Sequence, residues 1–413
     1  MPLAERDGAL CVEGVPLTEI AAQHGTPCFV YSRTALESAY REFDGAFCDL
    51  DHLTCYALKA NSNLAVLDVF ARQGSGFDVV SGGELARVIA AGGDPSKVVF
   101  SGVGKSDDEL RRGLEVGIRC FNVESASELQ RLDAIAAGMA TRAPVSLRIN
   151  PDVDPMTHPY IATGLKESKF GIAFADAPAL YRRAAAMAHV EVTGIDMHIG
   201  SQITALEPHR AAATKVLELV DGLAAEGIRL KHVDLGGGLG IRYRDETPVA
   251  LADYAAMVRD LFRGRGESVL FEPGRRLTAN AGLLLTRVMY LKPGAERSFA
   301  VVDAAMNDLL RPALYDAWHD VRPVRARPER ASRWQIVGPV CESADFLARD
   351  RELALEEGDL LVILSAGAYA MSMSSNYNSR PRAAEILVDG NAMHLAARRE
   401  SIEEIFARES RLP

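Results

Sequence analysis

The chain has 413 residues, of which 48% are hydrophobic and 25% are charged, so two soluble domains with sizeable cores are expected. Its formal net charge of -10 argues against binding to nucleic acid or to an anionic membrane surface. The first ten residues lack the basic and apolar parts of a secretory signal, and no apolar run is long enough to span a bilayer. The six cysteines form no CxxC pair, so we expect reduced thiols in the cytoplasm and no bound metal.

From about residue 53 to 275, short apolar strands alternate with helical patterns. The expected strands are 53–59, 76–81, 97–102, 119–124, 145–150, 192–200, 232–236 and 269–274. The expected helices are 64–72, 83–91, 107–116, 127–137, 177–188, 209–226 and 251–263. Two helix starts have the spacing of a capping box, Ser106 with Glu109 and Ser125 with Glu128. This alternation predicts an α/β fold, a (β/α)8 barrel of the TIM type. A doubly wound sheet is the main alternative, but it usually has fewer strands and a Gly-rich turn after the first strand.

After about residue 276 the pattern changes to strands with few long helices. The expected strands are 283–289, 297–303, 333–337, 359–364 and 383–388. A further strand, 28–31, lies in the opening segment and could join them. We therefore predict three parts: residues 1–30, an N-terminal segment that joins the β domain; residues 31–275, the barrel; and residues 276–413, a C-terminal all-β domain.

Lys59 is the most informative residue, because it ends an apolar, strand-like run and is followed by small polar residues. An amine at the end of a buried strand is costly unless it is paired or neutralised. A desolvated, neutral lysine can act as a nucleophile toward a carbonyl group. The alternative is a lysine whose ammonium group reaches the solvent from the end of the strand.

Further candidate side chains fall at the carboxyl ends of the expected strands, where barrel enzymes have their active sites. They are Asp78, Arg148, His198, Ser201, Gly236, Gly237, Gly238, Glu272, Gly274 and Arg275. Each has a simpler interpretation: Asp78 could cap a turn, His198 could be a core histidine, and the glycines could form only a tight turn. Their joint placement on one face of the barrel favours a functional site.

These groups match the needs of a pyridoxal phosphate site. Glycines let backbone N–H groups approach a phosphate, and loops late in a barrel are frequent phosphate sites. A carboxylate such as Glu272 could keep a pyridine nitrogen protonated, and a flat imidazole such as His198 could stack on a ring. Lys59 could bind the cofactor covalently.

The chain resembles the fold-type III pyridoxal-phosphate decarboxylases, which have an alanine-racemase-like barrel. The motifs in the barrel region are YALKAN at 56–61, FDVVSGGE at 77–84, HIGSQ at 198–202, LGGGLG at 235–240 and EPGR at 272–275. Those in the β region are RPALY at 311–315, CESAD at 341–345 and GAY at 367–369. The motifs occur in the family's order, and one small departure is Ala344, where we expect glycine.

The resemblance implies a role for each matching residue. Catalytic roles fall to Lys59, which would carry the cofactor, to Glu272 at the pyridine nitrogen, to His198 on the ring and to Cys341 as general acid. The cofactor would also contact Asp78, Arg148, Ser201, Gly237, Gly238, Gly274, Arg275 and Tyr369. The substrate would contact Arg275, Arg311, Tyr315, Glu342 and Tyr369. A head-to-tail homodimer would bring the β domain of one chain over the barrel of the other.

The arginines also indicate the class of substrate. Arg275 and Arg311 can bind a carboxylate bidentately, and Glu342 can take an ammonium group. The expected substrate is therefore a diamino dicarboxylic acid. The resemblance implies that it is meso-2,6-diaminopimelate, decarboxylated to L-lysine and CO2 in the last step of lysine biosynthesis. Two alternatives remain: another enzyme on this scaffold (a basic amino-acid or carboxynorspermidine decarboxylase, or an amino-acid racemase), and a non-catalytic pyridoxal-phosphate-binding homologue.

Overall fold

The computed structural model describes residues 3–154 and 168–413, which form two compact units. The β unit consists of the residues up to Ala39, Tyr243–Asp245 and everything from Thr278 onward, and the barrel unit consists of Tyr40–Arg242 and Glu246–Leu277. The chain passes from the first unit to the second within helix α2 (Arg33–Gly45), whereas the sequence pattern placed this boundary near residue 30.

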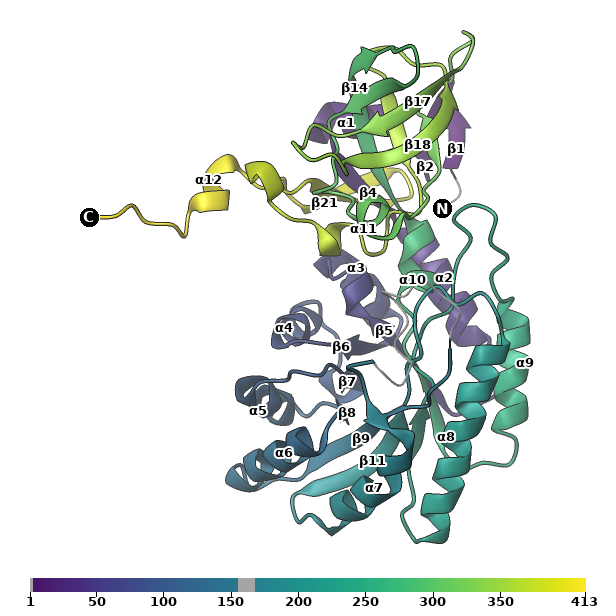
Figure 1. Ribbon diagram of the computed structural model, residues 1–413, viewed down its shortest axis with the longest axis vertical. Coiled ribbons are helices and arrows are strands. Elements are labelled where there is room, and N and C mark those ends of the chain that lie inside the picture. Colours follow the sequence, from purple (N-terminus) through teal and green to yellow (C-terminus); the bar gives the residue numbers. More distant parts are fainter. Residues whose placement is uncertain (1–2, 155–167) are drawn as a thin grey trace. The chain divides into compact units, whose positions relative to one another are not determined.

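The barrel unit contains eight parallel strands in the order β9-β11-β12-β13-β5-β6-β7-β8, and a pairing of β8 with β9 closes the barrel (Figure 1). The strands are β5 (His52–Ala57), β6 (Gly76–Val79), β7 (Val98–Phe100), β8 (Cys120–Val123), β9 (Ala143–Asn150), β11 (Val190–Asp196), β12 (His232–Asp234) and β13 (Ser268–Phe271). The two-residue strand β10 (Ile172–Ala173) pairs with β9. The predicted barrel is thus confirmed, and the doubly wound sheet is excluded.

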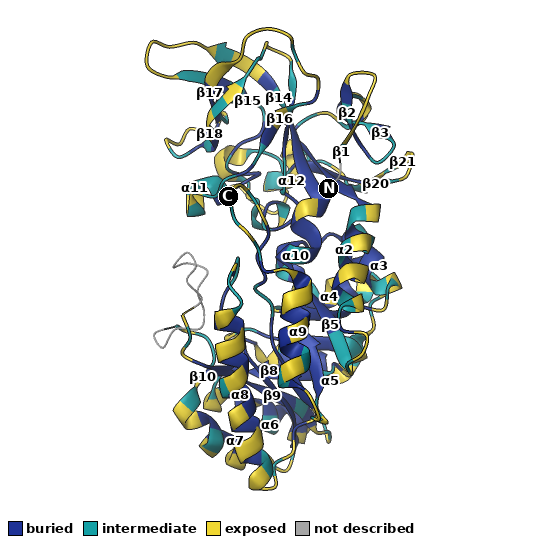
Figure 2. Ribbon diagram, turned by 90° about the vertical axis from the view of Figure 1, so that its right-hand side faces the viewer, coloured by how far each residue is buried: buried dark blue, intermediate teal, exposed yellow. Residues whose placement is uncertain are grey.

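Helices cover the outside of the barrel and bury one face each, while most of the strands are buried (Figure 2). They are α3 (Leu64–Arg72), α4 (Gly82–Ala90), α5 (Asp107–Val116), α6 (Ala126–Gly138), α7 (Ala177–Ala186), α8 (Glu207–Ala225) and α9 (Leu251–Leu261). Strands buried on both faces explain the near-continuous apolar runs of the sequence. Within the described ranges, no helix is both long and apolar enough to cross a membrane.

The two expected capping boxes have different outcomes. Ser106 and Glu109 exchange both hydrogen bonds at the start of α5, as predicted. At the start of α6, Ser125 accepts the backbone N–H of Glu128, but the Glu128 carboxylate does not return a bond to Ser125. Its Oε2 accepts the backbone N–H of Glu124 at 2.9 Å, and its Oε1 lies 2.8 Å from the buried ammonium of Lys105.

The β unit is built on a sheet in the order β18-β17-β15-β14-β4-β20-β21, with β19 pairing with both β14 and β16. Its strands are β4 (Cys28–Ser32), β14 (Gly282–Lys292), β15 (Ser298–Val302), β16 (Val321–Pro323), β17 (Ser332–Val337), β18 (Phe346–Leu353), β19 (Leu360–Ile363), β20 (Ala384–Asp389) and β21 (Ala392–Ala397). A small sheet of β1 (Leu3–Arg6), β2 (Ala9–Val12) and β3 (Val15–Pro16) precedes them, and the helices are α1 (Leu17–His24), α11 (Arg311–Tyr315) and α12 (Ile402–Phe406).

The opening strand joins this sheet as expected, because β4 pairs with β14 and β20. The five later strands are also where the sequence pattern placed them. Besides the short strands β1, β2, β3 and β16, the pattern missed β18 and β21, the two ends of the sheet order. Both carry polar residues and exposed positions, which is typical of edge strands and hides the apolar alternation.

Candidate active site

Lys59 and Asp78 lie together at the carboxyl end of the barrel strands. Strand β5 ends at Ala57, and Lys59 sits in the 3-10 turn Leu58–Ala60 that follows it, not at the strand end itself. Its Nζ atom is 3.5 Å from Oδ2 of Asp78, whose side chain is fully buried in β6, while 36% of the lysine side chain is exposed. The expectation of a desolvated amine is corrected here, because the lysine is partly solvated and ion-paired.

Three buried carboxyl groups converge beside this pair. One oxygen of each of Asp196, Asp234 and Glu272 lies within 4.8 Å of the others. Burial first, and then the charge of Asp234, raise the pKa of Glu272 well above its usual value. Burial and then the charge of Asp196 do the same to the pKa of Asp234. Burial raises the pKa of Asp196 to about 7, although Arg148 opposes the shift. Burial and mutual repulsion thus disfavour the charged forms of these carboxyl groups, and a cationic ligand would stabilise them.

The sequence pattern indicated Glu272 but neither of the two aspartates. Asp196 is the last residue of β11 and Asp234 is the last residue of β12. The sequence did hold a signal for them, because both aspartates end strands that are followed closely by candidate site residues, His198 after β11 and Gly236 after β12. Asn122 on β8 adds a hydrogen bond from its Nδ2 to Oε1 of Glu272 at 3.3 Å.

Arg148 is buried on β9 and is surrounded by acidic groups. Its Nη1 lies 3.4 Å from Oε1 of Glu124, and its Nε lies 3.8 Å from Oδ2 of Asp196. The guanidinium carbon is 5.0 Å from the ring centre of Phe170. The arginine thus balances part of the negative charge in the barrel.

His198 is held by the glycine loop that follows β12. The backbone N–H of Gly237 donates to Nδ1 of His198 at 3.2 Å, and that of Gly236 donates to Oδ1 of Asp234 at 2.8 Å. Burial, followed by neighbouring cations, lowers the pKa of His198 well below its usual value, so the ring is neutral. Of the three glycine amides, only that of Gly238 donates to no residue in the described part of the chain. It is the amide best suited to an anionic ligand.

The glycines are required by close approach of the backbone. A Cβ atom on Gly237 would lie 2.2 Å from the carbonyl oxygen of Glu272, and one on Gly238 would lie 2.4 Å from that of Gly200. Gly238 also has a φ of 107°, which L residues rarely adopt. The loop is therefore both a tight turn and the point where neighbouring strand ends meet.

Ser201, Gly274 and Arg275 complete the predicted set in the barrel unit. Arg275 is buried at the start of α10 (Arg275–Thr278), and its Nη2 donates to Oγ of Ser201 at 2.9 Å. A Cβ atom on Gly274 would lie 3.0 Å from that of Ala60. Gly274 therefore lies beside the turn that carries the lysine.

In the β unit, Arg311 is buried and held by residues that the sequence analysis missed. Its Nη1 donates to Nε2 of His319 at 2.8 Å, and its guanidinium carbon lies 4.5 Å from the ring centre of Tyr243. The other ring nitrogen of His319 contacts the carbonyl oxygen of Leu364 at 2.8 Å. Tyr315 ends the same short helix and is half-buried. No local sequence pattern marked His319 or Tyr243 as a functional residue.

Cys341 and Glu342 are exposed on the β unit. The backbone N–H of Cys341 donates to Oδ1 of Asn378 at 2.8 Å, and the hydroxyl of Tyr377 donates to Oε2 of Glu342 at 3.3 Å. The thiol is thus not an inert core group. Tyr369, also in this unit, is half-buried, with a φ of 55°.

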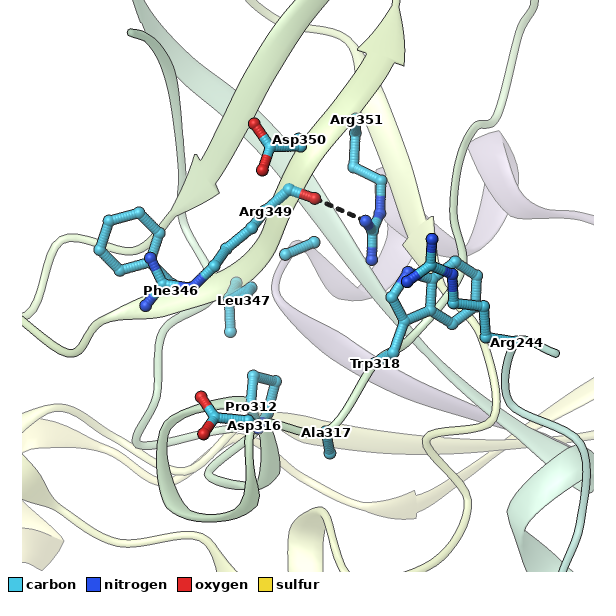
Figure 3. Close-up of a pocket in the computed structure, with 11 residues that line it drawn as sticks. Arg244, Pro312, Asp316, Ala317, Trp318, Phe346, Leu347, Arg349, Asp350 and Arg351 are labelled. Carbon is cyan, nitrogen blue, oxygen red and sulfur yellow. Dashed lines mark hydrogen bonds between the residues drawn. The ribbon is translucent and has the colours of Figure 1, made fainter. Parts of the chain in front are cut away.

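A pocket of about 310 Å³ lies in the β unit between the α11 segment and β18 (Figure 3). Its wall includes Trp318 and Arg351, whose guanidinium carbon is 4.6 Å from the indole ring centre. Nη2 of Arg351 donates to the carbonyl oxygen of His319 at 2.9 Å. None of the predicted site residues lines this pocket.

The closed barrel, with a lysine, buried carboxyls and a glycine loop at one end, has the architecture of a pyridoxal enzyme. A family model described as the pyridoxal-binding domain of pyridoxal-dependent decarboxylases matches residues 33–279. The chain belongs to this family.

Individual relatives are similar along nearly the whole chain. The diaminopimelate decarboxylase of Pseudomonas aeruginosa is 60% identical, covering 99% of this chain and 98% of the relative. That of Vibrio cholerae is 56% identical, with the same coverage. The crystal structure of diaminopimelate decarboxylase from Helicobacter pylori complexed with L-lysine is 41% identical. It superposes with a TM-score of 0.92 and covers 95% of this chain and 98% of its own.

Proposed function

We propose that this protein decarboxylates meso-2,6-diaminopimelate to L-lysine and CO2, the last step of lysine biosynthesis, with pyridoxal 5'-phosphate as cofactor. The observation that carries the proposal is the 60% identity to a diaminopimelate decarboxylase over 99% of the chain. The residues expected for catalysis, Lys59, His198, Glu272 and Cys341, are all present.

The chemistry of the barrel site fits the cofactor. Three carboxyl groups are buried close together around Glu272, so the positive charge of a protonated pyridine nitrogen would stabilise the carboxylate form of Glu272. The amide of Gly238 and the hydroxyl of Ser201 are candidates for the phosphate, and the neutral His198 ring suits stacking. The bound cofactor supplies the electron sink for loss of CO2.

Within that site each residue has a proposed task. Lys59 supplies the amine that holds the cofactor, and the Asp78 carboxylate keeps its ammonium close when it is not engaged. Glu272 holds the proton of the ring nitrogen. Because the cluster is buried, its interaction with a cation is weakly screened by solvent. Arg148 offsets the remaining negative charge from the neighbouring strand.

Arg311 is proposed to bind a substrate carboxylate. A guanidinium matches a carboxylate bidentately, and removing such a partner from a buried pair costs on the order of 2–5 kcal/mol. Tyr315, Tyr369 and Glu342 are proposed to contact the same substrate. Arg275 is also proposed there, although its Nη2 already donates to Ser201.

We further propose a homodimer with shared active sites. Cys341 and Glu342 are exposed, as groups that serve a neighbouring chain must be before assembly. The Cys341 thiol would protonate the carbon that has lost CO2, since a positioned acid is needed there. The cytoplasmic location stays a prediction from the sequence.

The direct test is incubation of the purified protein, loaded with pyridoxal 5'-phosphate, with meso-2,6-diaminopimelate. We expect CO2 and L-lysine in equal amounts, and neither product from the Lys59→Ala variant. Parallel assays with L-lysine and L-ornithine separate this function from a basic amino-acid decarboxylase. Turnover of those two compounds but not of meso-diaminopimelate would contradict the proposal.

A further inference from the structure

In the β unit, two aromatic side chains pack around the guanidinium of Arg311. This side chain is buried, with 6% of the residue exposed. On one side its Nη1 contacts Nε2 of His319 at 2.8 Å, and its guanidinium carbon lies 4.5 Å from the ring centre of Tyr243. The rings of Tyr243 and His319 also meet edge to face, with centroids 5.4 Å apart. Two aromatic side chains therefore define the place of one cation.

The hydrogen bonds determine the tautomer of the histidine. The carbonyl oxygen of Leu364 can only accept, so Nδ1 of His319 carries the proton. Nε2 then has a lone pair and accepts from Arg311, which can only donate. The imidazole in this arrangement is neutral, because a proton on both nitrogens would turn the contact into a clash of donors.

A neutral acceptor has a specific advantage at this position. A carboxylate in place of His319 would hold the guanidinium equally well, but it would neutralise the charge and compete with an anionic ligand. The imidazole and the tyrosine ring hold the cation without cancelling its charge. These two side chains thus orient the guanidinium of Arg311 without themselves supplying an opposite charge.

The histidine is itself held firmly. Only 1% of His319 is exposed, and its carbonyl oxygen accepts Nη2 of Arg351 at 2.9 Å. The same guanidinium covers the indole of the preceding residue, Trp318, in the wall of the pocket (Figure 3). Both the ring and the backbone of His319 are therefore fixed, as an orienting residue requires.

We propose that His319 and Tyr243 are positioning residues that hold the Arg311 guanidinium in the orientation in which it binds a substrate carboxylate. This inference rests on the proposed function of Arg311. It predicts that loss of either positioning contact weakens substrate binding far more than turnover.

Two amide substitutions separate positioning from general stability. In His319→Asn the amide nitrogen takes the place of Nδ1 and keeps the bond to Leu364, but the acceptor for Arg311 is lost. In His319→Gln the amide oxygen reaches the place of Nε2 and keeps that acceptor. We expect the KM for meso-diaminopimelate to rise about tenfold or more in His319→Asn, the loss of one charge-assisted hydrogen bond, with kcat within about twofold. In His319→Gln we expect KM to stay within about threefold of the parent value.

Substitutions of Tyr243 provide a second pair of variants, in which His319 is unchanged. Tyr243→Phe keeps the ring face and should leave KM near the parent value. Tyr243→Leu removes the face and should raise it by about five- to tenfold, the loss of a desolvated cation–π contact. This pair keeps the inference testable if His319→Asn does not fold. No rise in Tyr243→Leu would then overturn it.

The same assay on Arg311→Ala separates the proposed role of Arg311 in substrate binding from the proposed positioning role of His319 and Tyr243. If Arg311→Ala raises KM but His319→Asn does not, or both amide variants raise it equally, the positioning role is wrong and the role of Arg311 stands. If Arg311→Ala itself leaves KM unchanged, another residue binds the substrate carboxylate, and both proposals are wrong. In the double variant Arg311→Ala/His319→Asn, KM should match that of Arg311→Ala alone, because the histidine acts through the arginine.

Discussion

Gly237→Ala should damage the barrel site by forcing apart two strand ends. The added Cβ atom would lie 2.2 Å from the carbonyl oxygen of Glu272, and contacts under 3.0 Å are essentially never observed for real Cβ atoms. The backbone must therefore move by at least the difference of about 0.8 Å (3.0 minus 2.2). The same residue donates its N–H to His198 at 3.2 Å, so the movement also endangers that hydrogen bond.

Overpacking of a tight contact costs about 1–3 kcal/mol, and the lost hydrogen bond costs about 0.5–1.5 kcal/mol. The total of about 1.5–4.5 kcal/mol, centred near 3 kcal/mol, lowers the melting temperature by about 6–12 °C in a unit of this size. We also expect weaker retention of pyridoxal 5'-phosphate, because the loop is the proposed phosphate site. Thermal unfolding and the cofactor content after gel filtration measure the two effects.

Gly222→Ala is the matched control. Gly222 lies inside α8, and nothing approaches within 4 Å of the position of its Cβ atom. This substitution should stabilise the protein by about 0.5–1 kcal/mol, because glycine is unfavourable inside a helix. If Gly237→Ala melts with the parent protein and keeps its cofactor, the close contact with Glu272 is absent and the reasoning fails.

Four further predictions concern the barrel site and its assembly. Borohydride should fix pyridoxal 5'-phosphate on the peptide that contains Lys59, and label on another lysine refutes the assignment. Glu272→Gln should bind the cofactor yet lose most of its turnover, whereas near-normal turnover excludes the proposed pairing. Asp234 has a folded-state pKa well above its unfolded value of about 4, so its contribution to stability is present below about pH 4 and is lost as the pH rises through the folded pKa. The stability gained by Asp234→Asn in the cofactor-free protein should therefore be larger at pH 8 than at pH 5 in urea unfolding, and an equal gain contradicts the shift. Lys59→Ala and Cys341→Ala should each be nearly inactive, but their mixture should recover up to about a quarter to half of the activity once heterodimers form, and no recovery would place both groups in the same chain's site.

The order of the barrel elements was predictable because it follows from local periodicity. Short apolar runs such as 76–81, each followed by an amphipathic helix, leave few other folds for a chain of this length. A parallel barrel also brings all strand ends to one face. The proximity of Lys59 to Asp78 therefore followed from topology before any side chain was placed.

The edges of the β unit were not predictable in the same way. Strand β18 carries alternating charges and lies at one end of its sheet, so its sequence reads as a loop. It becomes a strand because β17 offers it a row of hydrogen-bonding partners. Such pairing is non-local, and no pattern within eight residues of sequence reports it.

The environment of each functional group was decided by tertiary structure alone. The sequence named Glu272 and Arg311 as the charged groups of interest, but it contained nothing to say that Asp196 and Asp234 lie against the first or that His319 holds the second. Burial and distance are properties of segments that are far apart in sequence and meet only when the chain packs. The pKa shifts of the carboxyl cluster and the orientation of the arginine arise from those distances, because desolvation and Coulomb interaction depend on what surrounds a charge and not on its neighbours in the chain.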